Sequence, residues 1–68
     1  MNLIEFVKLC SEITYITVIE DDRIIASGYP SEVLCILMPR SWAYNLVITM
    51  AEVLTPLRRG LYLYAKER

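Results

Sequence analysis

The sequence contains no histidine, and only two of its 68 residues are glycine. Without histidine the commonest general base near neutral pH is missing, which excludes Ser-His-Asp and Cys-His catalytic systems. The glycines, Gly28 and Gly60, are too far apart to form a glycine-rich loop that cradles phosphate. We therefore expect a protein that is not an enzyme and that carries no cofactor.

Cysteine is also scarce, with Cys10 and Cys35 as its only occurrences. Two cysteines alone cannot complete a four-ligand zinc site, and small secreted scaffolds normally use more than one disulfide. Both lie in apolar segments, where a free cysteine behaves as a small hydrophobic residue. The N-terminal apolar run is interrupted by Glu5 and Lys8 and follows no basic segment, unlike a signal peptide. We expect reduced, buried thiols, no metal site and a cytoplasmic location.

Long apolar runs are missing, although 56% of the residues are hydrophobic. A membrane-spanning helix needs about 20 consecutive apolar residues. The longest uncharged stretch after the N-terminal segment, residues 41–51, includes serine, asparagine and threonine. A domain of roughly 60 residues buries only about 60% of its unfolded surface. We therefore expect no membrane contact, and an apolar excess that a homo-oligomer, most simply a dimer, would cover.

The first half of the chain predicts a helix followed by a β-hairpin. Residues 2–12 begin with an Asn-x-x-Glu capping pattern and repeat apolar side chains at three- and four-residue spacing. Residues 13–19 are β-branched and aromatic on both alternating faces, which favours a strand internal to a sheet. A second strand over residues 24–27 follows an acidic tip, residues 20–22, which we interpret as a solvated turn rather than a cation site.

The second half predicts a short helix and two further strands. A helix over residues 32–38, capped by Ser31 and stopped by Pro39, is apolar on nearly every side. It is therefore expected between two layers or at an interface. Residues 45–54 fit strand or helix, and we choose strand because the closing segment needs a neighbour. That closing strand, residues 61–66, should turn Leu61, Leu63 and Ala65 to the core and Tyr62, Tyr64 and Lys66 outward.

These elements predict an α+β fold in a single domain over residues 1–68. The expected architecture is a two-layer sandwich in the order α-β-β-α-β-β, with a small antiparallel sheet that carries the helices on one face.

Residue types that are enriched at interface hot spots occur in two segments of the second half. One segment surrounds Trp42, which is either a core anchor or a contact residue. The other is basic and aromatic and includes the outward side chains of the closing strand. The predicted partner-binding residues are Arg40, Trp42, Tyr44, Arg58, Arg59, Tyr62, Tyr64 and Lys66.

The partner most consistent with this composition is a protein. Aromatic rings also stack on nucleic-acid bases while lysine and arginine neutralise phosphates, so a nucleic-acid-binding module is an alternative. The net charge of −1 disfavours it. A ligand-sequestering oligomer, in which tyrosine and arginine clamp a small molecule, is the other alternative.

Short motifs recur in order along the chain, namely Thr17-Val18-Ile19, Asp21-Asp22, Ile25, Gly28 and Leu61-Tyr62-Leu63. They fit an outline of an amphipathic helix, a T-V-I-x-D-x-x-x-I hairpin, a glycine, a short helix and a final L-x-L strand. This outline resembles that of the short uncharacterised α+β proteins encoded by bacteriophages and prophages. The resemblance implies a phage- or prophage-encoded protein that binds a host protein, in some cases as an anti-defence inhibitor of bacterial immune systems.

Overall fold

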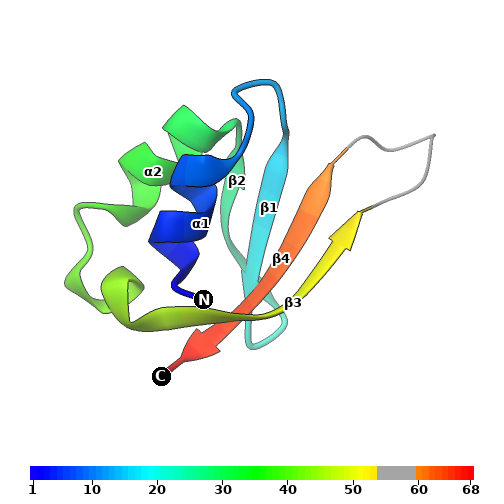
Figure 1. The fold of residues 1–68 in the computed structure, drawn as a ribbon. Helices are drawn as coiled ribbons and strands as arrows, with labels where there is room; N and C mark the ends of the chain where they lie inside the picture. Colours follow the sequence, from blue (N-terminus) through cyan, green and yellow to red (C-terminus); the bar gives the residue numbers. More distant parts are fainter. Residues whose placement is uncertain (54–59) are drawn as a thin grey trace.

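Two helices lie on one side of a four-stranded sheet in the computed structural model, which describes residues 1–53 and 60–68 (Figure 1). The predicted α+β class, the order of the elements and the placement of the helices on one face are confirmed. A short 3₁₀ helix, η1, is an addition that the sequence did not predict. The elements are α1 (Leu3–Leu9), β1 (Ile16–Glu20), β2 (Arg23–Gly28), α2 (Pro30–Leu37), η1 (Ser41–Asn45), β3 (Leu46–Val53) and β4 (Leu61–Glu67).

The strands are arranged in the order β2-β1-β4-β3. The pairs β1–β2 and β3–β4 are antiparallel, whereas β1 and β4 are parallel, so the sheet is mixed and the expectation of an antiparallel sheet is wrong for this pair. The reason is the crossover through α2 and η1, which returns the chain so that β3 runs in the direction of β2. Strand β1 has a neighbour on each side, as predicted.

Helix α1 starts with the predicted cap. The side-chain oxygen of Asn2 accepts a hydrogen bond from the backbone N–H of Glu5 at 3.2 Å, which satisfies one free donor of the first turn. The helix is shorter than the predicted range 2–12, because Cys10 already has extended backbone angles. Strand β1 likewise begins later than predicted, at Ile16 rather than at Ile13. Ile13 lies before the strand and is 86% exposed.

Helix α2 begins two residues earlier than predicted. Pro30 occupies its first turn, where a missing N–H is no loss, so the N-cap is Tyr29 and not Ser31. The carboxylate of Glu32 accepts a hydrogen bond from the backbone N–H of Tyr29 at 3.2 Å.

The core lies between the helices and one face of the sheet. Alternate residues of the strands enter it, including Leu63 and Ala65 as predicted, while Leu61 packs at its margin. The buried apolar residues are Leu3, Ile4, Val7, Ile16, Val18, Ala26, Val33, Leu37, Ala43, Leu46, Leu63 and Ala65.

None of the described elements forms a second layer over the outer side of α2. Ile36 and Met38 are 38% and 42% exposed, so the expectation of a helix packed between two layers is wrong. The alternative, an interface, stays a prediction. Both cysteines are free, but Cys35 is exposed and Cys10 only half-buried, which corrects the expectation of buried thiols. Partial burial raises the pKa of the Cys10 thiol, which donates a hydrogen bond to the carbonyl of Phe6 at 3.5 Å.

The acidic tip of the β1–β2 hairpin is a two-residue turn in which both central residues have positive φ. Asp21 has φ 49° and Asp22 has φ 62°, the signature of a type I′ turn. This turn suits the right-handed twist of the strands, and glycine is the preferred second residue because it has no side chain to strain.

We expect Asp22→Gly to raise the free energy of unfolding by about 0.5–1 kcal/mol, because it relieves backbone strain and removes one of three adjacent acidic charges. The midpoint of urea unfolding measures the effect. Asp22→Ala removes the same charge but keeps a side chain at positive φ, so it should not stabilise. A stabilisation of equal size in both variants would assign the gain to charge alone.

Candidate functional site

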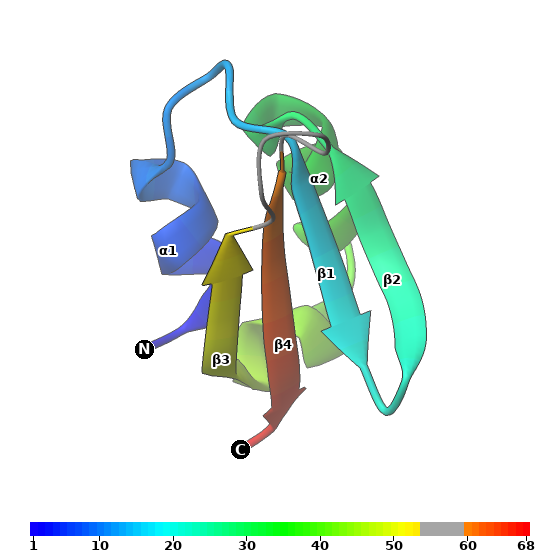
Figure 2. The ribbon, with the colours of Figure 1, turned by 90° about the vertical axis from the view of Figure 1, so that its right-hand side faces the viewer.

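Within the part of the chain that the structure describes, one face of the sheet carries no helix. Figure 2 shows the four strands from this side, with the helices behind them. The outward orientation predicted for the closing strand is confirmed, because the other alternating set of β4 enters the core. The register then assigns the residues of the other strands to the same face, which we call the open sheet face. Its members are Thr17, Ile19, Ile24, Ser27, Val47, Met50, Glu52, Tyr62, Tyr64 and Lys66.

An apolar row crosses the middle of the open sheet face. Tyr64 on β4 is aligned with Ile19 on β1 and with Met50 on β3, and Ile19 is aligned in turn with Ile24 on β2. Ile24 is 67% exposed and Met50 is 52% exposed, so the two ends of the row are open to solvent. The row therefore spans all four strands.

A more polar row lies beside it. Tyr62 is aligned with Thr17 on β1 and with Glu52 on β3, and Thr17 is aligned with Ser27 on β2. Thr17 is only 6% exposed although none of the described helices covers it. The side chains around Thr17 therefore form a continuous surface rather than isolated projections.

Charge on the open sheet face is sparse and of both signs. Among its members only Glu52 and Lys66 are charged. They belong to opposite ends of the face, because Glu52 is aligned with Tyr62 and Lys66 follows Tyr62 by four residues along β4. The face is apolar and aromatic in the middle, with one anionic and one cationic end.

The predicted partner-binding residues do not form one patch. Tyr62, Tyr64 and Lys66 share the open sheet face. Trp42, on η1, lines a hollow on the helix side of the sheet together with side chains from the acidic hairpin. At 39% exposure it is neither a buried anchor nor a fully free contact residue.

Tyr44 and Arg40, the predicted contact residues on either side of Trp42, also lie away from the open sheet face. Tyr44 is 47% exposed, and its hydroxyl donates a hydrogen bond to the carbonyl of Met38 at 3.0 Å. Its own carbonyl accepts one from the side chain of Asn2 at 2.8 Å, so Tyr44 joins α2 to the start of α1. Arg40, the N-cap of η1, is exposed. Arg58 and Arg59 lie outside the described residues.

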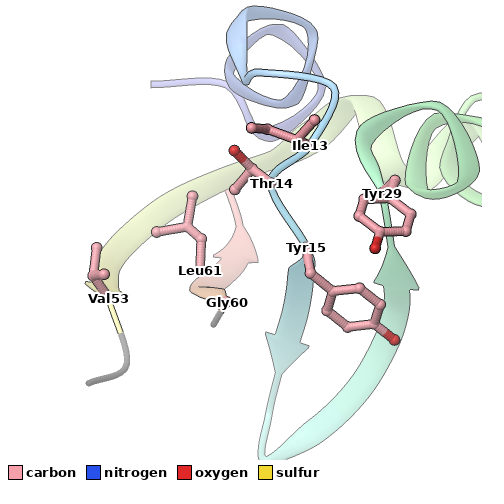
Figure 3. Close-up of a pocket in the computed structure, with 7 residues that line it drawn as sticks. All are labelled: Ile13, Thr14, Tyr15, Tyr29, Val53, Gly60 and Leu61. Carbon is pink, nitrogen blue, oxygen red and sulfur yellow. The ribbon is translucent and has the colours of Figure 1, made fainter. Parts of the chain in front are cut away.

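A second hollow of about 600 Å³ opens at the end of the sheet where β4 begins (Figure 3). The rings of Tyr15 and Tyr29 meet edge to face there, with centroids 5.6 Å apart and planes at 84°. None of its described lining residues is charged, so they offer hydroxyl groups and apolar surface but no acid or base. They are Ile13, Thr14, Tyr15, Tyr29, Val53, Gly60 and Leu61.

Sequence reasoning missed Ile19, Ile24 and Met50, which supply the apolar row. The signal for Ile19 was available, because a strand that is apolar on both alternating faces has a second face to cover. Ile24 and Met50 lie next to irregularities in strand register, which the sequence does not mark.

No protein-family model, curated protein sequence or solved structure matches this chain. Within residues 1–53 and 60–68, no three or more acidic or cysteine side chains are grouped so that they could hold a metal ion. None of the helices in the described part of the chain has the length and apolar character needed to span a lipid bilayer.

Proposed function

We propose that this protein works without catalysis, by binding another protein chain through the open sheet face. The observation that carries the proposal is the uncovered apolar row of Ile24, Ile19, Tyr64 and Met50. A sheet with one solvated face normally alternates apolar and polar residues, so that the free face is polar. Here the free face has isoleucine, methionine and tyrosine at its centre. Contiguous exposed apolar surface marks interaction sites, and tyrosine is enriched at their hot spots.

The identity of the partner and the cellular location are inferred from the sequence. The resemblance to short phage and prophage proteins supports a host protein as the biological partner, with inhibition of a bacterial defence system as one form of that function. A cytoplasmic location agrees with the free thiols of Cys10 and Cys35, since cysteines stay reduced in that compartment.

Nucleic acid is the second candidate partner, supported by one observation. Tyr62 and Tyr64 are two residues apart on the same uncovered face, and Lys66 follows them. Bases stack on aromatic side chains in this arrangement on other sheets. The negative charge of Glu52, which is aligned with Tyr62, would repel a phosphate backbone. The net charge of −1 also disfavours nucleic acid. A protein partner therefore fits the face better.

We expect Ile24→Lys to reduce partner recovery at least tenfold when a tagged chain is expressed in its native host and purified. An unpaired ammonium buried in an apolar interface costs several kcal/mol, whereas on the free surface it is solvated and leaves the fold intact. The control is Ile36→Lys, which makes the same change on the outer side of α2, where the side chain is 38% exposed. Quantitative mass spectrometry measures recovery and thermal unfolding verifies the fold.

Three results separate the candidates. Loss of the partner with Ile24→Lys but not with Ile36→Lys supports the open sheet face. Equal recovery by both variants, or loss with Ile36→Lys alone, contradicts the proposal. If recovery of the partner disappears after nuclease treatment and falls steeply with salt, the open sheet face binds nucleic acid instead of protein.

A further inference from the structure

We infer that a second copy of this chain covers the open sheet face in the isolated protein. The two copies pack sheet on sheet about a two-fold axis that crosses the strands at the level of Tyr64. This inference rests on the proposed function of the face and names the chain that occupies it. Closed two-fold dimers are the commonest assemblies of identical chains, and they require a surface that is complementary to itself.

The charges of the open sheet face are complementary to themselves under this rotation. Along β4, Tyr64 lies midway between Tyr62 and Lys66, and Glu52 is aligned with Tyr62. A half-turn about an axis in the interface, across the strands at Tyr64, lays β4 of one copy over β4 of the other in the opposite direction. The Lys66 end of each copy then faces the Glu52 end of the other. Two pairs of opposite charge form at once, and among the described members of the face no like charges meet.

The same rotation superimposes the apolar row on itself. Tyr64, Ile19 and Met50 are all at the level of the axis, so the row of one copy packs against the row of the other. Face-to-face sheets pack about 10 Å apart with their strands inclined by about 30°, which displaces residues near the axis least. The side chains that are most costly to leave in water therefore occupy the centre of the interface.

The area of the face is sufficient for a specific but weak dimer. Four strands with a spacing of about 4.8 Å and about 3.3 Å per residue give a face of roughly 19 by 20 Å. Two such faces with their side-chain relief bury on the order of 1,000 Å², near the lower limit of specific interfaces. We therefore expect a concentration-dependent equilibrium between monomer and dimer.

Charge reversal in two separate variants tests the arrangement. Glu52→Lys and Lys66→Glu each place like charges at both pairs of their own homodimer, and we expect the dissociation constant to rise at least tenfold. A mixture of the two variants restores both pairs, so the mixed dimer should form with close to the original affinity, as should the homodimer of the double variant. Glu12→Lys, an exposed reversal before β1, is the control and should leave the affinity unchanged. Sedimentation velocity at low salt measures all five samples beside the original chain.

The outcomes distinguish this inference from the proposed function. A monomer at every concentration that still captures a partner dependent on Ile24 overturns the second copy and leaves the proposed function standing. A dimer that resists both reversals and is lost with Ile36→Lys lies on α2 and overturns the second copy on the open sheet face, whereas the proposed function is judged separately by partner recovery with Ile24→Lys. Single reversals that weaken the dimer without rescue in the mixture contradict the two-fold arrangement. Rescue in the mixture supports it. Thermal unfolding that is unchanged in each variant, measured at a concentration low enough for every sample to be monomeric, assigns the effects to association.

Discussion

Replacing Leu63 by alanine should lower the free energy of unfolding by about 3 kcal/mol, the largest effect that we expect of a single substitution. Leu63 is 0% exposed and lies on β4, one of the two internal strands. Its neighbours in register are Val18 on β1 and Ala51 on β3. Because both flanking strands are fixed in the sheet, the cavity left by the missing atoms cannot close easily, so the lost packing adds to the lost burial.

The measurement is urea unfolding of Leu63→Ala beside Val53→Ala. Val53 lies on the adjacent strand β3 and also loses aliphatic atoms, but it is 77% exposed, so we expect less than about 0.5 kcal/mol. A protein of this length has a total stability of roughly 3–10 kcal/mol. The pair is therefore best compared in an Asp22→Gly background, which keeps the weaker variant folded. Equal losses at the two positions would contradict the assignment of Leu63 to the core.

Local features of this fold were predictable because they depend on neighbours in sequence. The hydrogen bond from the backbone N–H of Glu5 to the side chain of Asn2 follows from the residue type at position 2, three residues before the donor. The alternation of the closing strand follows from the pleat, which turns successive side chains to opposite faces. This alternation correctly placed Tyr62 and Tyr64 on the free face of the sheet and Leu63 in the core.

Register between strands was not predictable, because it is fixed by contacts that are distant in sequence. On β2, Ala26 and Ile25 both face the core side, and Ile24 is aligned with Ile19 after the irregularity. Simple alternation from Ala26 would have turned Ile24 inward. On β3 the irregularity between Ile48 and Met50 has the same effect on Met50. Each shift moves one large apolar side chain to the open sheet face.

The two layers were predicted from the sequence, but how many sides of α2 they cover was not. The apolar character of α2 is consistent with two covered sides, with one covered side and a partner, or with simple exposure. The structure buries Val33 and Leu37 against the sheet and leaves Cys35 and Ile36 exposed. Whether Cys35 is buried depends on which distant segments pack over it, and the residues next to it in sequence do not determine this. The apolar excess that composition revealed is thus divided between the outer side of α2 and the open sheet face.

The second large effect concerns Gly28, at the end of β2. Its φ of +136° lies in a region that side chains rarely adopt, and a Cβ built there would be 3.0 Å from the Cβ of Glu32. An alanine therefore meets backbone strain and a contact with the first turn of α2 at once. Relief would move Glu32, whose carboxylate accepts the hydrogen bond from the N–H of Tyr29. Strain of this kind costs about 1–3 kcal/mol, so we expect Gly28→Ala to destabilise the protein by about 2 kcal/mol.

Gly60→Ala is the matched control, because the chain has only these two glycines. A Cβ at Gly60 would lie 3.5 Å from the carbonyl oxygen of Tyr15, an ordinary contact, and φ is outside the strained range. The alanine also reduces the entropy of the unfolded chain, so stability should stay within about 0.5 kcal/mol of the original or rise slightly. Thermal and urea unfolding of the two variants give the comparison. A loss at Gly60 as large as that at Gly28 would show that neither the left-handed backbone nor the contact with Glu32 makes glycine necessary at residue 28.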